Sequence, residues 1–414
     1  MTSGLALHPF RATRYASADG LGDRLCPPYD VVPPAERAAL VARSETNAVR
    51  LVLPGEGEAA LAGGDPHTGA RRLLDTWQAD GVLAVDGKPA LYVYEMAADG
   101  HVTRGLIGAV ELRHPADGVV LPHENTMAGP VADRLALMTA TDADLEPIYL
   151  VYDGGGAASA VVASAGDRTP MAEARTPDGT THRLWAITDP EELAEVAADL
   201  ADRRALIADG HHRYATYLQR QAEHDGEPGP WDRGLTLLVD STAHGPQVHP
   251  IHRVVGIDHA RAQEALLGRA TVSDPLSVAA ADRLVQESPD FAVALAQGDR
   301  AVVVRDVDPD LVATALGAHA DSVMARLDVT LLHRVLVERL WGLTDDEETV
   351  GYAHSVEDAI AAAGTDGTAV LLRPTPVADV AAVARAGERM PRKSTLFAPK
   401  PASGMVIRRL ADDA

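Results

Sequence analysis

The chain has little that could cross-link it or anchor it in a membrane. It contains a single cysteine, Cys26, among 414 residues, which excludes an internal disulfide and gives no sign of an oxidising compartment. No apolar run is long enough to cross a bilayer. Residues 1–8 also lack the basic flank and apolar core of a signal peptide. We therefore expect a soluble cytoplasmic protein.

Positive charge is scarce as well. Lys and Arg number 37 against 60 Asp and Glu, so the formal net charge is −23. A surface this acidic repels nucleic acids and anionic lipids, and we expect neither a nucleic-acid nor a membrane partner. A small-molecule substrate remains, and local basic clusters stand out against the acidic background. The oligomeric state is left open.

Helical and strand-like segments alternate along the sequence, which is typical of an α/β or α+β fold with mixed sheets and flanking helices. The clearest helix starts are Asp189 and Asp308, each followed by proline. Residues 47–53 are predicted to form a strand, and residues 55–66 a mobile loop rich in Gly, Glu and Asp. A boundary near residue 260 would divide a core of residues 1–260 from a C-terminal α/β region of residues 261–414.

Two polar clusters lie in the first third of the chain. In Cys26-Pro27-Pro28-Tyr29-Asp30-Val31, two prolines fix where Tyr29 and Asp30 point, although the segment could also be a rigid surface turn. The second cluster contains His123 and Glu124 and is followed by Asp133-Arg134. Its side chains are of acid/base or metal-ligand types, and the alternative is a polar loop with a local ion pair. Position 127 is Met, so the HExxH pattern of a zinc protease is absent.

The most informative cluster is Ala208-Asp209-Gly210-His211-His212-Arg213-Tyr214. A strand-like run precedes it and a helical stretch follows it. A strand that turns at glycine into a helix presents backbone N–H groups and a positive dipole end to an anion. Arg213 and the two histidines would add side-chain donors. A helix cap at Asp209 is the alternative, but a cap does not require His-His-Arg after it.

A basic cluster, Met390-Pro391-Arg392-Lys393-Ser394-Thr395 with Lys400 after it, lies near the C-terminus. A P-loop requires glycine directly before the lysine, and Arg392 stands there, so a Walker A motif is rejected. The segment is either a phosphate-facing loop or a solvated run of charges. The sequence also has no GxSxG motif, no GxGxxG motif after a strand, and no cysteine pair for zinc.

These four clusters occur in the same order in a widespread family, and the chain resembles the bacterial and archaeal domain-of-unknown-function 1015 family (DUF1015) over about residues 8–410. The matching motifs are PPYDV, PHENT with Asp133-Arg134, DGHHRY and MPRKST. The sequence departs at Asn125, where the family often has arginine, and at Leu396, where it often has tyrosine. If the family arginine binds an anion, Asn125 cannot supply its charge.

The DGHHR segment alone is similar to the nucleotide-binding signature of the ParB/sulfiredoxin superfamily, which includes nucleotide-dependent serine kinases. This resemblance implies a ParB/sulfiredoxin-like core in which the motif holds phosphates at a helix N-terminus. Asp209, His211, His212 and Arg213 would then form a phosphate and metal site. Asp209 would be the Mg²⁺ ligand.

The leading hypothesis is a nucleotide-dependent kinase for a small hydroxyl metabolite such as serine, with Mg²⁺ and ATP, ADP or CTP. The base would be Asp30 or Glu124. Two alternatives stay open: a non-catalytic nucleotide or phosphometabolite sensor, and a metal-dependent hydrolase or lyase. The remaining candidate residues are His123 in the catalytic group, and Gly210, His211, His212, Arg213, Arg134, Lys393, Ser394, Thr395 and Lys400 in the phosphate-binding group.

Overall fold

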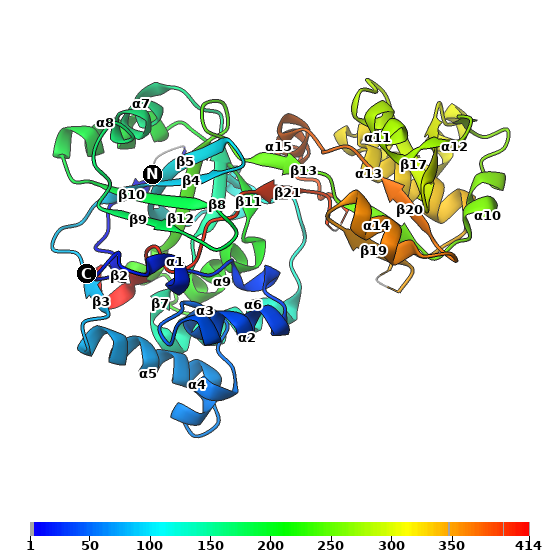
Figure 1. Cartoon of the computed structure of the whole chain (residues 1–414). Coiled ribbons are helices and arrows are strands. Elements are labelled where there is room, and N and C mark those ends of the chain that lie inside the picture. Colours follow the sequence, from blue (N-terminus) through cyan, green and yellow to red (C-terminus); the bar gives the residue numbers. More distant parts are fainter. Residues whose placement is uncertain (1–3, 347, 392, 414) are drawn as a thin grey trace. The chain divides into compact units, whose positions relative to one another are not determined.

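Strands and helices interleave throughout the chain, which confirms the expected mixed α/β class. The computed structural model describes residues 4–346, 348–391 and 393–413. They group into two units, one of Met1–Pro246 with Pro399–Ala414 and one of Gln247–Ala398. Figure 1 labels many of the elements of each unit. None of the helices in the described ranges is long and apolar enough to cross a membrane.

A nine-stranded mixed sheet, counted over described residues, forms the centre of the first unit. The strand order is β6-β11-β8-β12-β5-β4-β10-β9, with β1 beside β5. Strand β11 runs parallel to β6 and antiparallel to β8, and β8 runs parallel to β12. The strands are β1 (Leu7–His8), β4 (Leu91–Ala98), β5 (His101–Glu111), β6 (Val120–Leu121), β8 (Ile148–Tyr152), β9 (Ala172–Arg175), β10 (Thr181–Ile187), β11 (Ala205–Asp209) and β12 (Arg233–Asp240).

Two short strand pairs and a set of helices complete the first unit. Strand β2 (Thr13–Tyr15) pairs with β3 (Leu83–Val85), and β7 (Ala143–Asp144) pairs with β22 (Arg408–Arg409). The helices are α1 (Leu21–Arg24), η1 (Tyr29–Val31), α2 (Pro34–Arg43), α3 (Val49–Val52), α4 (Glu56–Leu61), α5 (Pro66–Ala79), η2 (Pro115–Asp117), α6 (Ala128–Thr141), α7 (Gly156–Ala165), α8 (Pro190–Leu200), α9 (His211–Ala222), η3 (Pro230–Asp232) and η7 (Leu410–Asp412).

Capping residues start several helices where the sequence predicted them. Asp189 accepts a hydrogen bond from the N–H of Glu191 at the start of α8, and Asp308 accepts one from the N–H of Asp310 at the start of α12 (Pro309–Leu316). Two local predictions were wrong. Residues 49–52 form helix α3, whose valines and leucine are buried, and residues 56–61 of the expected loop form helix α4.

The two faces of the large sheet differ in character. One face belongs to an apolar cluster that joins the strands to helices α7, α8 and α9 and includes Val93, Ile148 and Leu150. Because side chains alternate along a strand, Tyr94 and Tyr149 point to the opposite face. Asp209 pairs in register with Tyr149 and therefore shares that face. The polar groups of the candidate site gather there.

The C-terminal segment returns to the first unit and is fixed there by buried ion pairs. Arg408 Nη1 lies 2.8 Å from Asp144 Oδ2, and Arg220 Nη2 lies 2.8 Å from Asp144 Oδ1. All three side chains are buried. The N–H of Leu235 on β12 also donates to Asp144 Oδ2. One carboxylate therefore ties together a helix, a central strand and the chain's last segment.

The second unit contains a seven-stranded antiparallel sheet, counted over the residues described there, in the order β15-β18-β17-β20-β14-β19 with β16 beside β18. Its strands are β14 (His252–Val255), β15 (Thr271–Val272), β16 (Leu276–Ser277), β17 (Ala292–Gln297), β18 (Arg300–Arg305), β19 (Val350–Ala353) and β20 (Thr368–Leu371). Its helices are α10 (His259–Glu264), α11 (Val278–Gln286), α12 (Pro309–Leu316), η4 (Gly317–His319), η5 (Val323–Arg326), α13 (Asp328–Leu331), η6 (Leu332–Leu340), α14 (Val356–Ala363) and α15 (Val377–Arg385).

The second unit is an insertion in the first. Strands β13 (Gln247–His249) and β21 (Leu396–Ala398) pair antiparallel, with Gln247 opposite Ala398, so the inserted segment enters and leaves at one place. This division differs in two ways from the single boundary expected near residue 260. It falls at residues 246/247, and Pro399–Ala414 rejoin the first unit. Hydrophobic periodicity is local, so it could not reveal the returning segment.

Candidate functional site

The turn between β11 and α9 is built as the sequence predicted. Asp209 is the last residue of β11, and Gly210 follows in the left-handed region with φ 92°. A Cβ at position 210 would lie 3.1 Å from Ile148 Cγ2 and 3.2 Å from Arg213 Nε, so both backbone conformation and space favour glycine. Helix α9 begins at His211. Its first N–H groups lack intrahelical acceptors, and the dipole adds a partial positive charge.

The carboxylate of Asp209 lies between two cations. Arg213 Nη2 is 2.5 Å from Asp209 Oδ2, and Lys400 Nζ is 2.5 Å from Asp209 Oδ1. Arg213 is only 2% exposed, and it also donates to the backbone oxygen of Pro147. Arg213 therefore holds the turn together from inside, whereas Lys400 reaches Asp209 from the returning C-terminal segment.

Lys400 also brings Asp30 into the site. Its Nζ lies 3.7 Å from Asp30 Oδ2, and the Asp30 side chain is 38% exposed. Burial lowers the pKa of Lys400, but the carboxylates of Asp209 and Asp30 raise it by more, so the net pKa is raised. The ammonium is charged at neutral pH and has three donors, of which Asp209 takes one.

The second cluster contacts the start of α9. The N–H of His123 donates to His211 Nε2 at 3.3 Å, and the two rings meet edge to face with centroids 4.6 Å apart. The N–H of Met127 donates to His212 Nε2 at 3.1 Å. Glu124 Oε1 lies 4.0 Å from His123 Nε2. Two backbone N–H groups thus hold both motif histidines in orientation.

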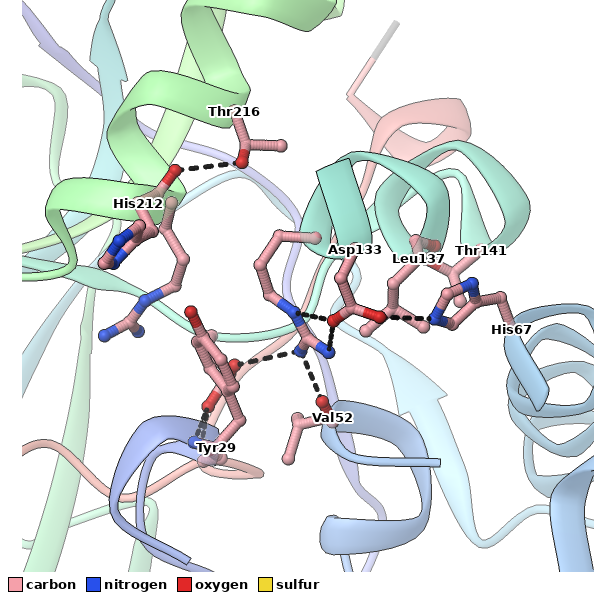
Figure 2. A network of polar contacts seen from close by, with 12 residues as sticks. Tyr29, Val52, His67, Asp133, Leu137, Thr141, His212 and Thr216 are labelled. Atoms are coloured by element: carbon pink, nitrogen blue, oxygen red, sulfur yellow. Dashed lines mark hydrogen bonds and ion pairs between the residues drawn. The ribbon is translucent and has the colours of Figure 1, made fainter. Parts of the chain in front are cut away.

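Arg134 joins the second cluster to the first. Its guanidinium carbon lies 4.1 Å from the centroid of the Tyr29 ring, a cation–π distance. Arg134 Nη2 contacts Asp133 Oδ2 at 2.6 Å, and the other oxygen of Asp133 faces His67 Nε2 at 3.2 Å (Figure 2). Arg134 is buried and also donates to the oxygen of Val52. Its charge therefore orients Tyr29, the neighbour of Asp30.

Sequence reasoning missed Glu146, a buried carboxylate beneath these groups. Its Oε1 accepts from the N–H of Tyr29 at 3.0 Å and from Ser403 Oγ at 2.8 Å, and its Oε2 lies 4.0 Å from Arg134 Nη1. Burial raises its pKa, although Arg213 and Arg134 oppose the shift. The only signal in the sequence was a glutamate directly before a proline and a fully apolar strand.

Tyr149 was missed as well. Its side chain is fully buried beside Asp209, and among the described residues its hydroxyl has no hydrogen-bond partner. Burial, followed by the charge of Asp209, raises the pKa of this phenol well above its ordinary value. A neutral hydroxyl therefore stands next to the carboxylate at the end of β11.

A chain of polar contacts, buried at Tyr94 and His182 and reaching the surface at Asp178, lies farther along the same face of the sheet. Tyr94 Oη accepts from the N–H of Ala402 at 3.2 Å and lies 2.8 Å from His182 Nδ1. His182 Nε2 lies 3.1 Å from Thr176 Oγ1, which donates to Asp178 Oδ1 at 2.6 Å. The chain connects the segment that carries Lys400 to the turn between β9 and β10.

These polar contacts make the stability of the fold depend on pH through His182. Burial lowers its pKa to about 4, against the opposing charge of Asp178. Above pH 6.5 the His182 ring is neutral in both the folded and the unfolded state. As the pH falls below 6.5, the ring takes up a proton first in the unfolded state, so the free energy of unfolding decreases until about pH 4. We expect a loss of about 3 kcal/mol across this window, measured by urea unfolding. His182→Gln should lose less stability over this range of pH. If the free energy of unfolding changes with pH identically in wild type and in the variant, His182 is not the group responsible.

The fourth cluster belongs to the second unit. Lys393 adopts a left-handed backbone conformation with φ 53°, and Ser394 Oγ donates to the oxygen of Pro391 at 2.5 Å. Arg392 lies outside the described residues. Lys393, Ser394 and Thr395 therefore remain predicted phosphate contacts, while the other predicted residues lie in the first unit.

The described residues around Asp209 do not form a metal site. Both oxygens of Asp209 face cations, which is the opposite of what Mg²⁺ requires from a ligand. Within the described ranges, no three His, Cys, Asp or Glu side chains converge in a way that could hold a metal ion. The expected role of Asp209 as a Mg²⁺ ligand does not fit this arrangement.

Several solved structures are similar to this chain at low sequence identity. A free serine kinase in complex with AMP is 13% identical, with a TM-score of 0.35 over 71% of this chain and 90% of that one. A conserved hypothetical protein from Pyrococcus furiosus is 14% identical, with a TM-score of 0.34 over 71% and 94%. SbnI from Staphylococcus aureus, truncated at its C-terminus, is 9% identical, with a TM-score of 0.36 over 73% and 87%.

All three TM-scores lie below 0.5. No curated protein matches the sequence. A family model does: the one described as "Protein of unknown function (DUF1015)" matches residues 7–330. The match spans the PPYDV, PHENT and DGHHRY motifs and most of the chain. The protein therefore belongs to the DUF1015 family.

Proposed function

We propose that this protein is a nucleotide-dependent phosphotransferase that acts on a small hydroxyl metabolite. The observation that carries the proposal is the position of Lys400. Its ammonium lies 2.5 Å from Asp209, at the start of helix α9, and 3.7 Å from Asp30, a partly exposed carboxylate. A cation, a helix N-terminus and a candidate base therefore occur together in one unit. Phosphoryl transfer depends on positioned phosphates, on positive charge that offsets the developing negative charge, and on a base for the acceptor hydroxyl.

The phosphates would bind at the start of α9. The first N–H groups of the helix, the positive end of its dipole and the ammonium of Lys400 all favour an anion there. His211 and His212 stand at the same turn and are oriented by backbone donors. Arg213, buried in its ion pair, supports this turn through Asp209 rather than by touching the ligand.

The transfer step would use Asp30 as the base. The acceptor hydroxyl oxygen forms a bond to the terminal phosphorus, and its proton passes to the Asp30 carboxylate. The bond between that phosphorus and the bridging oxygen breaks, and its electron pair stays on the shortened nucleotide. Lys400 offsets the charge that develops on the transferred group. His123 lies beside His211, and Glu124 lies 4.0 Å from His123; both remain candidates for acid/base or positioning roles.

Titration of ATP, ADP and CTP in the presence of Mg²⁺ tests the proposal. We expect saturable binding of one nucleotide, which Lys400→Ala weakens about 10- to 100-fold because a charge-assisted contact is lost. Lys400→Arg should restore part of the affinity, and Lys88→Ala, at an exposed lysine, should change nothing. Equal affinity in wild type and Lys400→Ala would refute the site.

Consumption of the bound nucleotide separates an enzyme from a sensor. Turnover that depends on a hydroxyl compound supports transfer, and Asp30→Asn should abolish it while leaving binding within about threefold. Binding without turnover for any hydroxyl acceptor would favour the sensor. Lys393→Ala tests the fourth cluster in the same assays. A loss of affinity there would support the predicted phosphate contact.

A further inference from the structure

A cavity of about 360 Å³ opens in the first unit, and no function has been assigned to it above. One wall is apolar and includes Pro27, Pro28, Val31 and Leu40. Its volume lies within the range of about 300–1,000 Å³ that is usual for small-molecule sites. The mixed lining, with a broad apolar wall and a few polar groups, is also typical of such sites.

Another part of the lining is polar and is held in place by the chain of polar contacts from Tyr94 to Asp178. Thr176, Asp178, Thr180 and His182 line the cavity, and His182 is 3% exposed with both ring nitrogens within hydrogen-bond distance of a partner. The N–H of Thr180 also donates to Asp178 Oδ1 at 3.0 Å. This wall therefore exists before any ligand arrives, and binding costs little ordering of side chains.

The cavity adjoins the proposed base. Pro28 and Val31 flank the Tyr29-Asp30 pair in sequence, and both line the cavity. Lys400 lines it too, and its Nζ lies 3.7 Å from Asp30 Oδ2. A molecule in the cavity would meet the ammonium that contacts both the base and the start of α9. This is where an acceptor is needed, since the transferred group must lie between nucleotide and acceptor.

The charges around the cavity fit a zwitterion better than a polyanion. Glu36 and Asp178 supply two carboxylates, and Arg43 and Lys400 supply two cations. A polyphosphate would face both acids without compensation, whereas a molecule with one ammonium and one carboxylate finds a partner for each charge. The apolar wall gives room for a body longer than that of serine.

We propose that this cavity binds the phosphoryl acceptor, and that the acceptor is a hydroxyl-bearing α-amino acid with a side chain longer than that of serine. The inference rests on the proposed function for the transfer step only, because binding in the cavity is measurable without a nucleotide. The ammonium and carboxylate of the amino acid would face the charged side chains of the cavity lining. Its hydroxyl would point toward Lys400 and Asp30.

The test uses 5-hydroxy-L-norvaline and L-serine as probes of the full-length protein, without nucleotide, by ligand-observed NMR. We expect the longer probe to bind about tenfold more tightly, because it buries two more methylene groups. Leu40→Trp fills the apolar wall and should remove binding. Val31→Trp, at a 38% exposed position, should do the same without disturbing the core. Leu61→Trp, at an exposed leucine on α4, is the matched control.

Each outcome decides the assignment. Binding that both cavity variants lose, with nucleotide affinity unchanged, supports it. The assignment is overturned if neither probe binds wild type at millimolar concentration. It is also overturned if Leu40→Trp and Val31→Trp bind the longer probe as tightly as wild type does. Loss of nucleotide affinity in the cavity variants would mean that the cavity holds the nucleotide, and would also overturn it. If no nucleotide binds wild type, the proposed function fails, and the cavity is still judged by the probes.

Discussion

Asp144→Ala is expected to lower the free energy of unfolding of the first unit by about 3–5 kcal/mol. The substitution leaves Arg220 and Arg408 buried without the carboxylate that lies 2.8 Å from each, and breaking a buried pair costs about this much. The N–H of Leu235 loses its acceptor as well. Urea unfolding monitored by circular dichroism measures the change. The slope of the free energy of unfolding against urea concentration is determined for each variant, so that a change in stability is told from a change in the slope.

The control for this prediction is Asp19→Ala, which removes an exposed aspartate and should change stability by less than about 0.5 kcal/mol. The double variant Asp144→Ala/Arg408→Met should be less destabilised than the sum of its single variants, because removing both partners leaves one fewer uncompensated charge. Additive losses would show that Asp144 and Arg408 do not stabilise each other.

Asp209→Asn is expected to lower the pKa of Lys400 below the ordinary value for lysine. Burial is the largest influence on that pKa and acts to lower it, and the Asp209 carboxylate is the largest opposing charge. Without it, Asp30 at 3.7 Å is the remaining carboxylate that raises the pKa. We also expect a loss of stability of about 3 kcal/mol or more, since Arg213 loses its partner in the interior.

The pKa of Lys400 is simple to measure, because the protein has only three lysines, Lys88, Lys393 and Lys400. Reductive methylation with ¹³C-formaldehyde followed by a pH titration reports each amine separately, and Lys400→Arg identifies its signal. The signal of exposed Lys88 serves as the internal reference in both proteins. An unchanged titration of Lys400 in the variant would show that Asp209 does not control its charge.

Local chemistry made much of the architecture predictable. Proline and aspartate mark the starts of α8 and α12. Residues 49–52 misled because a short apolar run has no clear period: nearly all its side chains are buried in α3, which in sequence resembles a strand. The glycines of residues 55–66 concealed α4, because glycine is a poor helix former.

The site was predictable where one motif supplied both the backbone turn and the side chains, as at Asp209 and Gly210. It was not predictable where residues meet across the fold. Glu146 binds Tyr29 and Ser403, which are separated from it by 117 and 257 positions. No short-range pattern records those contacts, because a buried carboxylate is stabilised by partners that the tertiary structure supplies.

The path of the chain also sets the order in which the site can be completed during synthesis. Residues 247–398 leave the ribosome before Lys400 does, and at 5–20 residues per second their synthesis takes on the order of ten seconds. During that delay the first unit has Asp209 without Lys400 and Asp144 without Arg408. The insertion can pair β13 with β21 only near the end of this period. A nascent chain should therefore acquire its phosphate-binding cation, and the ion pairs that fix its last segment, in a single late step.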